Sequence, residues 1–355
     1  MVIFTQPLRT LAVLLVGFSL IAGCSSKSNH TALANPLADI GNGLRGPNGL
    51  HAMIYASGLA HATAMAFDGQ GRLWVATADY SDAGQDALYM IDGAGAAPVA
   101  VVTGLHTPLG LVWMGDSLFV SSKERVDAYS GLNGSAFTST RNVLTLPAGV
   151  GEVNGLVIAP DGRMQLGISA PCDHCTPMSD MSGAVVSFLP DGTDLRVDAQ
   201  RIRAPIGLAY FPNTDDLFVT MNQRDDLGDQ TPGDWLAIVA PGQSWGFPDC
   251  YGQGGAACTG APSPIATLDP HAAVGDVVIV TGQLGAATGT AALVAEWQTG
   301  KVQRVALTAQ GSSFTATVSP FLTGIANPFG LAVGPDQALY AGDWKSGTIY
   351  RVATN

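Results

Sequence analysis

A loop between residues 222 and 234 carries the densest group of chemically useful side chains in the sequence. It reads NQRDDLGDQTPGD, and its candidate residues are Asn222, Arg224, Asp225, Asp226, Asp229 and Asp234. Carboxylate and amide oxygens in a loop interrupted by Gly and Pro are the ligands that hard cations prefer. The spacing differs from that of an EF-hand, so the alternative is a solvated turn in which Asx side chains bond to nearby backbone.

The cysteines separate a leader segment from the folded part of the chain. Residues 11–21 are apolar, Arg9 precedes them, and Ile-Ala-Gly leads into Cys24. The run is too short for a comfortable transmembrane helix. It resembles the lipobox of bacterial lipoproteins, so we expect residues 1–24 to be a signal peptide and Cys24 to be lipidated. An ordinary signal peptide with a chance cysteine is the alternative.

A leader of this kind predicts a location in the bacterial cell envelope. Ser25 follows the cysteine, where no Asp retention signal stands, and this favours the periplasmic face of the outer membrane, with the lipid as the only membrane contact. Residues 25–48 are polar, Gly-rich and aperiodic, which predicts a flexible tether.

The other four cysteines are interpreted in the light of export, because exported proteins meet an oxidising compartment. Their number is even and their spacing is local, so we predict the disulfides Cys172–Cys175 and Cys250–Cys258. The CxxC pair encloses His174, and metal binding or redox chemistry is the alternative there.

The composition excludes a nucleic-acid partner. The 355 residues carry a net charge of −12, and no Lys/Arg-rich run supplies the basic patch that phosphate binding needs. Only 12% of the residues are charged, whereas 44 are Gly, so long helices are unlikely to be the basis of the fold.

A repeated sequence motif accounts for many of the Gly residues. Gly-Leu, an alternating strand, an Asp-Gly-like turn and a second strand recur six times, at intervals of 45 to 68 residues. The equivalent positions are Met65, Leu111, Leu156, Leu208, Asp276 and Leu331. A period of this size with several strands per unit is typical of a β-propeller. We therefore predict an all-β, six-bladed β-propeller over residues 49–355, with residues 50–58 pairing with the C-terminal blade to close the ring; a pair of β-sandwiches is the alternative.

The segment after Asn222 also carries a family resemblance. NQRDDLGDQTPGDWL, followed by SWGFPDCYG, resembles the corresponding loop of the glucose/sorbosone dehydrogenase family, the soluble quinoprotein sugar dehydrogenases. RIRAPIGL at 201–208 and the APCDHC phrase resemble further motifs, and the similarity extends over residues 50–355. The resemblance implies a six-bladed propeller with pyrroloquinoline quinone (PQQ) and Ca²⁺ at the central axis, a sugar or aldehyde substrate and an external electron acceptor.

The resemblance also implies roles for individual residues. Those expected to contact the cofactor are Arg203, Asn222, Arg224, His271 and Lys345. Those expected to hold Ca²⁺ are Asp225, Asp226, Asp229 and Asp234. Glu152 stands where the family has its catalytic His and is the predicted base; Trp245 is interpreted as a packing residue or a cavity wall.

Three family positions are changed in this chain. Ala204 replaces an Asn, Glu296–Gly300 replace most of a polar phrase, and Asn327 begins a segment where the family has Arg. The predicted function is PQQ- and Ca²⁺-dependent oxidation of an aldose or related sugar aldehyde. Because of the changes, a propeller that only binds a ligand or glycan is the main alternative, and a Ca²⁺-dependent lactonase is a lesser one.

Overall fold

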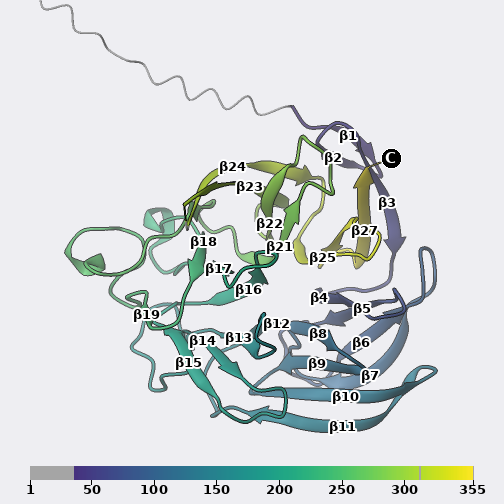
Figure 1. Cartoon of the computed structure of the whole chain (residues 1–355), viewed down its shortest axis with the longest axis horizontal. Helices are drawn as coiled ribbons and strands as arrows, with labels where there is room; N and C mark the ends of the chain where they lie inside the picture. Colours follow the sequence, from purple (N-terminus) through teal and green to yellow (C-terminus); the bar gives the residue numbers. More distant parts are fainter. Residues whose placement is uncertain (1–35, 312, 355) are drawn as a thin grey trace, which may run out of the picture. The chain divides into compact units, whose positions relative to one another are not determined.

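A computed structural model of the chain describes residues 36–311 and 313–354. These residues form six β-sheets arranged as a six-bladed β-propeller, so the predicted fold is confirmed (Figure 1). Among them, no helix is long and apolar enough to cross a membrane. The predicted leader with Cys24 and residues 25–35 lie outside the described residues, so lipidation and location stay predictions.

Blades 1 to 3 follow one another along the chain. Blade 1 consists of β4 (Ala62–Phe67), β5 (Leu73–Thr77), β6 (Asp86–Ile91) and β7 (Val99–Leu105). Blade 2 consists of β8 (Gly110–Met114), β9 (Ser117–Ser122), β10 (Arg125–Asn133) and β11 (Ala136–Thr145). Blade 3 consists of β12 (Val153–Ile158), β13 (Met164–Ile168), β14 (Ala184–Phe188), β15 (Arg196–Gln200) and the later β19 (Gln243–Ser244).

Blades 4 to 6 complete the ring and take in strands from the N-terminal part of the chain. Blade 4 consists of β16 (Pro205–Tyr210), β17 (Leu217–Met221), β18 (Trp235–Val239) and β20 (Ala266–Thr267). Blade 5 consists of β21 (Val274–Thr281), β22 (Thr290–Glu296), β23 (Lys301–Gln310), β24 (Ser313–Thr323), β2 (Leu44–Gly46) and β1 (Ala38–Gly41). Blade 6 consists of β25 (Pro328–Val333), β26 (Leu339–Asp343), β27 (Thr348–Thr354) and β3 (Leu50–Ala56). Two short 3-10 helices lie in loops, η1 (Gly228–Gln230) and η2 (Ala256–Cys258).

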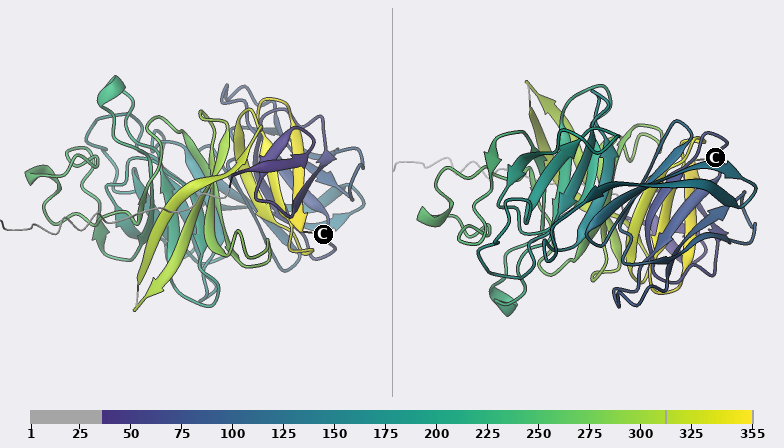
Figure 2. Two further views of the ribbon diagram at one scale, coloured as in Figure 1. Left: turned by 90° about the horizontal axis from the view of Figure 1, so that it is seen from above. Right: turned by 90° about the horizontal axis from the view of Figure 1, so that it is seen from below.

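The six repeated phrases form the innermost strands and their hairpin partners. Strands β4, β8, β12, β16, β21 and β25 surround the centre, and each packs against the innermost strands of its two neighbours (Figure 1). The longest hairpins, β10–β11 and β23–β24, lie at the outside of the ring (Figure 2). The ring closes as predicted, because β3 pairs antiparallel with β27, from Ala56 opposite Ile349 to Leu50 opposite Thr354.

The predicted tether is shorter than expected. Residues 38–46 form the β1–β2 hairpin, and Arg45 of β2 pairs with Thr323 of β24. Ile40 and Leu44 are buried in the apolar seam between blades 5 and 6, which explains why this Gly-rich segment is ordered. The boundary predicted at residue 48 was therefore wrong for residues 38–46.

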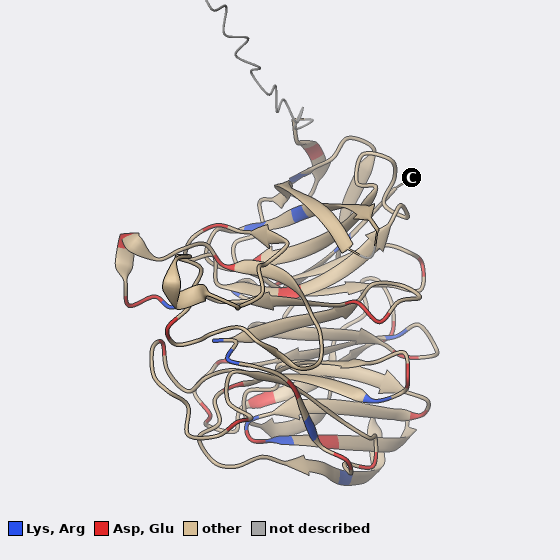
Figure 3. Ribbon diagram, turned by 60° about the vertical axis from the view of Figure 1, so that its left-hand side comes forward, with Lys and Arg blue, Asp and Glu red and all other residues tan. Residues whose placement is uncertain are grey.

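The apolar core is divided among the six seams of the ring. Each of six clusters of buried side chains combines residues from two neighbouring blades. Charged residues are sparse along the ribbon (Figure 3). Blades therefore adhere through apolar surface, and the polar groups able to do chemistry are concentrated in the loops.

Candidate functional site

A cavity of about 480 Å³ gathers five of the ten predicted catalytic, cofactor and metal residues at one edge of blades 4 and 5. We call it the blade 4–5 cavity; it is lined by Arg203, Asn222, Gln223, Asp225, Asp234, His271, Ala273, Trp297 and Gln298. These residues precede the first and third strands of a blade or follow its second strand. In an antiparallel sheet those three strand ends share one edge, which is why positions far apart in sequence meet here.

Arg203 is held at the cavity wall by a carboxylate. Its Nη2 pairs with Asp173, and its Nη1 donates a 3.4 Å hydrogen bond to the carbonyl of Asn222. Asp173 lies between Cys172 and Cys175, which form the predicted disulfide. Asp173 was not among the predicted site residues, although the disulfide that encloses it was predicted.

His271 is engaged at both ring nitrogens. Nδ1 lies 2.7 Å from a carboxylate oxygen of Asp225, and Nε2 lies 2.9 Å from the carbonyl oxygen of Gly228. Both partners are acceptors, so the ring satisfies both only as imidazolium. The Asp225 hydrogen bond, followed by the Gly228 carbonyl, raises the pKa of His271.

Asp234 is the buried acid of the cavity, with 2% of its surface exposed. Its carboxylate accepts backbone N–H groups from Gln223 at 2.7 Å and from Val274 at 3.3 Å. Burial raises the pKa of Asp234 to about 7, against the lowering effect of these two hydrogen bonds. A carboxyl group that titrates near neutrality can exchange a proton at working pH.

Asn222 and Trp297 supply the groups that suit a neutral polar ligand. The side-chain oxygen of Asn222 is buried and has no hydrogen-bond partner among the described residues. Trp297 offers an indole, and its backbone carbonyl is fixed by a 2.9 Å bond from the Asn327 side chain. Trp297 and Gln298 were not predicted; the only available signal was the lone Trp in the altered AEWQTG phrase.

Other predicted residues lie outside this cavity. Arg224 makes two 2.6 Å hydrogen bonds to Asp226 and stacks on Tyr251. Asp229 is exposed in η1, and Lys345 is exposed in the loop after β26. Within residues 36–311 and 313–354, no three His, Cys, Asp or Glu side chains are gathered to hold a metal ion, so the four predicted calcium ligands do not converge.

Glu152 occupies a different cavity. This cavity, of about 230 Å³, lies among loops of blades 1 to 3 and is also lined by Tyr80, Asp82 and Lys123. Glu152 itself is exposed. The predicted base is not among the residues that line the blade 4–5 cavity, and its role stays a prediction.

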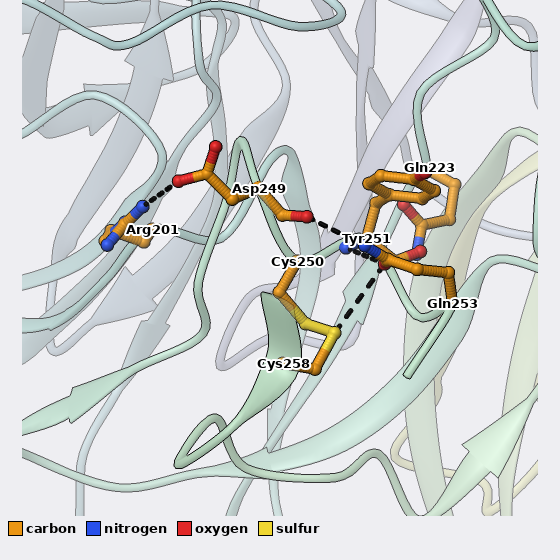
Figure 4. The surroundings of a disulfide bond; sticks show 7 residues. All are labelled: Arg201, Gln223, Asp249, Cys250, Tyr251, Gln253 and Cys258. Atoms are coloured by element: carbon orange, nitrogen blue, oxygen red, sulfur yellow. Dashed lines mark hydrogen bonds and ion pairs between the residues drawn. A yellow bond between two sulfur atoms is a disulfide. The ribbon is translucent and has the colours of Figure 1, made fainter. Parts of the chain in front are cut away.

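A small annex adjoins the blade 4–5 cavity. Arg203 and Gln223 line both spaces. The rest of the annex, of about 50 Å³, is lined by aromatic residues, by Arg201, Ile202, Met221, Pro262 and Pro264, and by residues 250–252. The predicted disulfide Cys250–Cys258 closes this segment (Figure 4). The Gln223 side chain donates to the Tyr251 carbonyl at 2.5 Å, and Arg201 pairs with Asp249 at 3.2 Å (Figure 4).

Comparisons with known proteins agree with this architecture. The sequence profile of a family described as "Domain of unknown function (DUF7133)" matches residues 44–353. No curated protein matches the chain. The holo form of the pyranose dehydrogenase PQQ domain from Coprinopsis cinerea is a similar solved structure, with a TM-score of 0.73, 17% identity, and 90% of this chain and 98% of that chain covered.

Two aldose sugar dehydrogenases are also similar. The PQQ-bound form from Streptomyces coelicolor has a TM-score of 0.68, 19% identity and coverage of 87% of this chain and 99% of that chain. The soluble enzyme from Escherichia coli, in its apo form, has a TM-score of 0.68, 16% identity and coverage of 86% and 100%. At these identities the similarity confirms the resemblance at the level of the fold.

Proposed function

The chain belongs to the family described as a domain of unknown function (DUF7133), and from that premise we propose that the protein binds a small neutral sugar in the blade 4–5 cavity. The unpartnered, buried side-chain oxygen of Asn222 carries this proposal. A buried polar atom without a partner is costly, and a ligand hydroxyl can donate to it or accept from the same amide.

The rest of the lining supports the same class of ligand. Gln298, Asp225 and Asn222 present planar polar groups, and Trp297 presents an apolar ring in the same space. Sugars combine hydroxyl groups with apolar C–H faces, so they match such a mixture. The structural neighbours described above are a pyranose dehydrogenase and aldose sugar dehydrogenases, which agrees with this choice.

Oxidation of the sugar with PQQ and Ca²⁺ is the second candidate function, and it is favoured by the PQQ named for two of those neighbours. PQQ carries several carboxylates and needs cations around it. Here Arg203 is engaged by Asp173, His271 is engaged by Asp225, and Asp234 adds a further acid. The lining therefore does not fit PQQ, and we derive no redox step through it.

Calorimetric titration of the full chain with neutral aldoses tests the first proposal. We expect binding that Asn222→Ala and Trp297→Ala weaken, whereas Lys345→Ala, an exposed residue outside the lining, leaves it unchanged. Absence of aldose binding at saturating concentrations contradicts the proposal.

A titration with PQQ and Ca²⁺ tests the second candidate. We expect weak or absent binding by the wild-type protein, and stronger binding by Asp173→Asn, which frees Arg203 from its carboxylate. Tight PQQ binding by the wild type, with dye reduction when an aldose is added, would instead establish the dehydrogenase.

A further inference from the structure

One buried polar atom of the annex next to the blade 4–5 cavity has no hydrogen-bond partner among the described residues. The Trp245 side chain lines the annex and is 6% exposed, and its Nε1 donor has no acceptor among the described residues. Buried indole N–H groups ordinarily find a partner. This donor is therefore available to a ligand that enters the annex, which is what distinguishes it from the equally unpartnered Trp113 Nε1 in blade 2.

Trp245 cannot easily turn away to find another acceptor. Its ring stacks on Trp235 with centroids 4.7 Å apart, and its backbone N–H donates to the Gln200 carbonyl at 3.0 Å. The following segment is clamped by a 2.6 Å bond from Arg201 to the Phe247 carbonyl and by the Cys250–Cys258 disulfide. The donor is thus held in a fixed position before any ligand arrives.

The size of the annex limits what can enter it. About 50 Å³ exceeds the roughly 10–15 Å³ that a single water needs, yet it is far too small for a sugar ring. A hydroxymethyl group has a suitable size, with an apolar carbon for the aromatic walls and an oxygen for the indole. Because Arg203 and Gln223 line both spaces, a ring in the main cavity lies next to the annex.

We infer that the annex is a specificity pocket that takes the exocyclic hydroxymethyl group of an aldohexose, with Trp245 Nε1 donating a hydrogen bond to its hydroxyl oxygen. This inference rests on the proposed sugar binding in the blade 4–5 cavity. It adds a preference for hexoses over the matching pentoses, which differ only by this group.

The test compares matched pairs of sugars on the full chain by calorimetry: D-glucose with D-xylose, D-galactose with L-arabinose, and D-mannose with D-lyxose. We expect the wild type to bind the hexose of at least one pair more tightly. Trp245→Phe keeps the ring but removes the donor, so it should weaken hexose binding roughly three- to tenfold and leave the pentose unchanged.

Trp113→Phe is the matched control, because Trp113 Nε1 is also buried without a partner but lies in blade 2. It should change neither affinity. A second readout is the indole N–H resonance of Trp245, which hexose binding should shift and pentose binding should not.

Three results overturn the inference. If Trp245→Phe weakens both members of a pair equally, or weakens neither, Trp245 does not bind the hydroxymethyl group. If the Trp245 resonance responds to pentoses as it does to hexoses, the hydroxymethyl group is not the occupant. If no sugar binds the wild type, the proposed function fails and the inference fails with it.

Discussion

At the scale of single residues, the carboxylates in and beside the blade 4–5 cavity are already paired with other groups of the protein. Asp225 holds His271, Asp173 holds Arg203, and Asp234 bridges the backbone of blades 4 and 5. The cavity consequently offers fixed, nearly balanced charges, which suits a neutral polar ligand better than an anion.

Replacing Asp225 by Asn should lower the pKa of His271 toward its ordinary value. The bonds to Asp225 and Gly228 raise that pKa, so they stabilise the fold below the unfolded pKa of about 6.5, and this stabilisation is lost as the pH rises through the folded pKa. NMR titration of the His271 ring measures the shift. Asp226→Asn is the control, because Asp226 bonds to Arg224 instead; an unchanged His271 titration in Asp225→Asn would contradict the assignment.

The sequence predicted which loops meet around this cavity better than which of their side chains line it. Arg203, Asn222, Asp225, Asp234 and His271 meet because each stands at a strand end of the repeated phrase, and the repeat can be read from the sequence. The repeat does not predict the direction in which each side chain of a loop points. Asp226 turns to Arg224 although its neighbour Asp225 turns to His271, and no periodicity distinguishes adjacent loop residues.

At the scale of elements, the repeated Gly before each innermost Leu or Asp reflects the approach of neighbouring strands. A Cβ added at Gly207 would lie 2.8 Å from the Asp276 Cα and from the Gly275 carbonyl of the next blade. The repeated Gly therefore marks the positions at which the backbones of neighbouring blades are in close contact.

Gly207→Ala should destabilise the protein by about 1–3 kcal/mol, because packed backbone has little room to yield. The control is Gly69→Ala, in a hairpin turn with no atom within 4 Å of the added Cβ, which should stay within about 0.5 kcal/mol of wild type. Urea unfolding measures both. Equal free energies of unfolding for Gly207→Ala and Gly69→Ala would show that blades 4 and 5 can move apart at no cost in stability.

The β1–β2 hairpin offers a second test at this scale. Leu44→Ala should cost about 2–4 kcal/mol, because Leu44 is fully buried in the seam between blades 5 and 6. Asn48→Ala, at an exposed position nearby, should have little effect. If unfolding of Leu44→Ala matches wild type, residues 38–46 behave as the tether that composition alone suggested. Composition missed the hairpin because three or four residues per strand are too few to give a periodic signal.

At the scale of the whole molecule, the six innermost strands enclose a central space of about 340 Å³. The side chains that line it are mostly apolar, whereas backbone groups also expose polar surface to it. Five blades place Met or Leu at the repeat position, and blade 5 places Asp276 there. The Asp276 carboxylate accepts N–H groups of Val277 at 2.9 Å and of Leu331 in blade 6 at 3.4 Å. Burial raises the pKa of Asp276 to about 7.

Stability should therefore fall as the pH rises from about 4 to about 7, since only the folded protein keeps the Asp276 proton in this window. Between pH 5 and pH 8 we expect the wild type to lose roughly 2–3 kcal/mol more than Asp276→Asn, which has no charge to bury. Urea unfolding at the two pH values measures this difference. Parallel losses in the two proteins would mean that water in the centre solvates the carboxylate.

The pairing of β3 with β27 also affects the order in which the chain can fold during its synthesis. Synthesis begins at the N-terminus, so Leu50 is made early and waits for Thr354, its partner almost at the other end. Until then β3 has an unpaired edge and blade 6 is incomplete, a state in which strands pair with the wrong neighbours. Ring closure therefore waits until β27 has been synthesised. Chaperones that shield free strand edges should matter more to this protein than to one whose first strands pair locally.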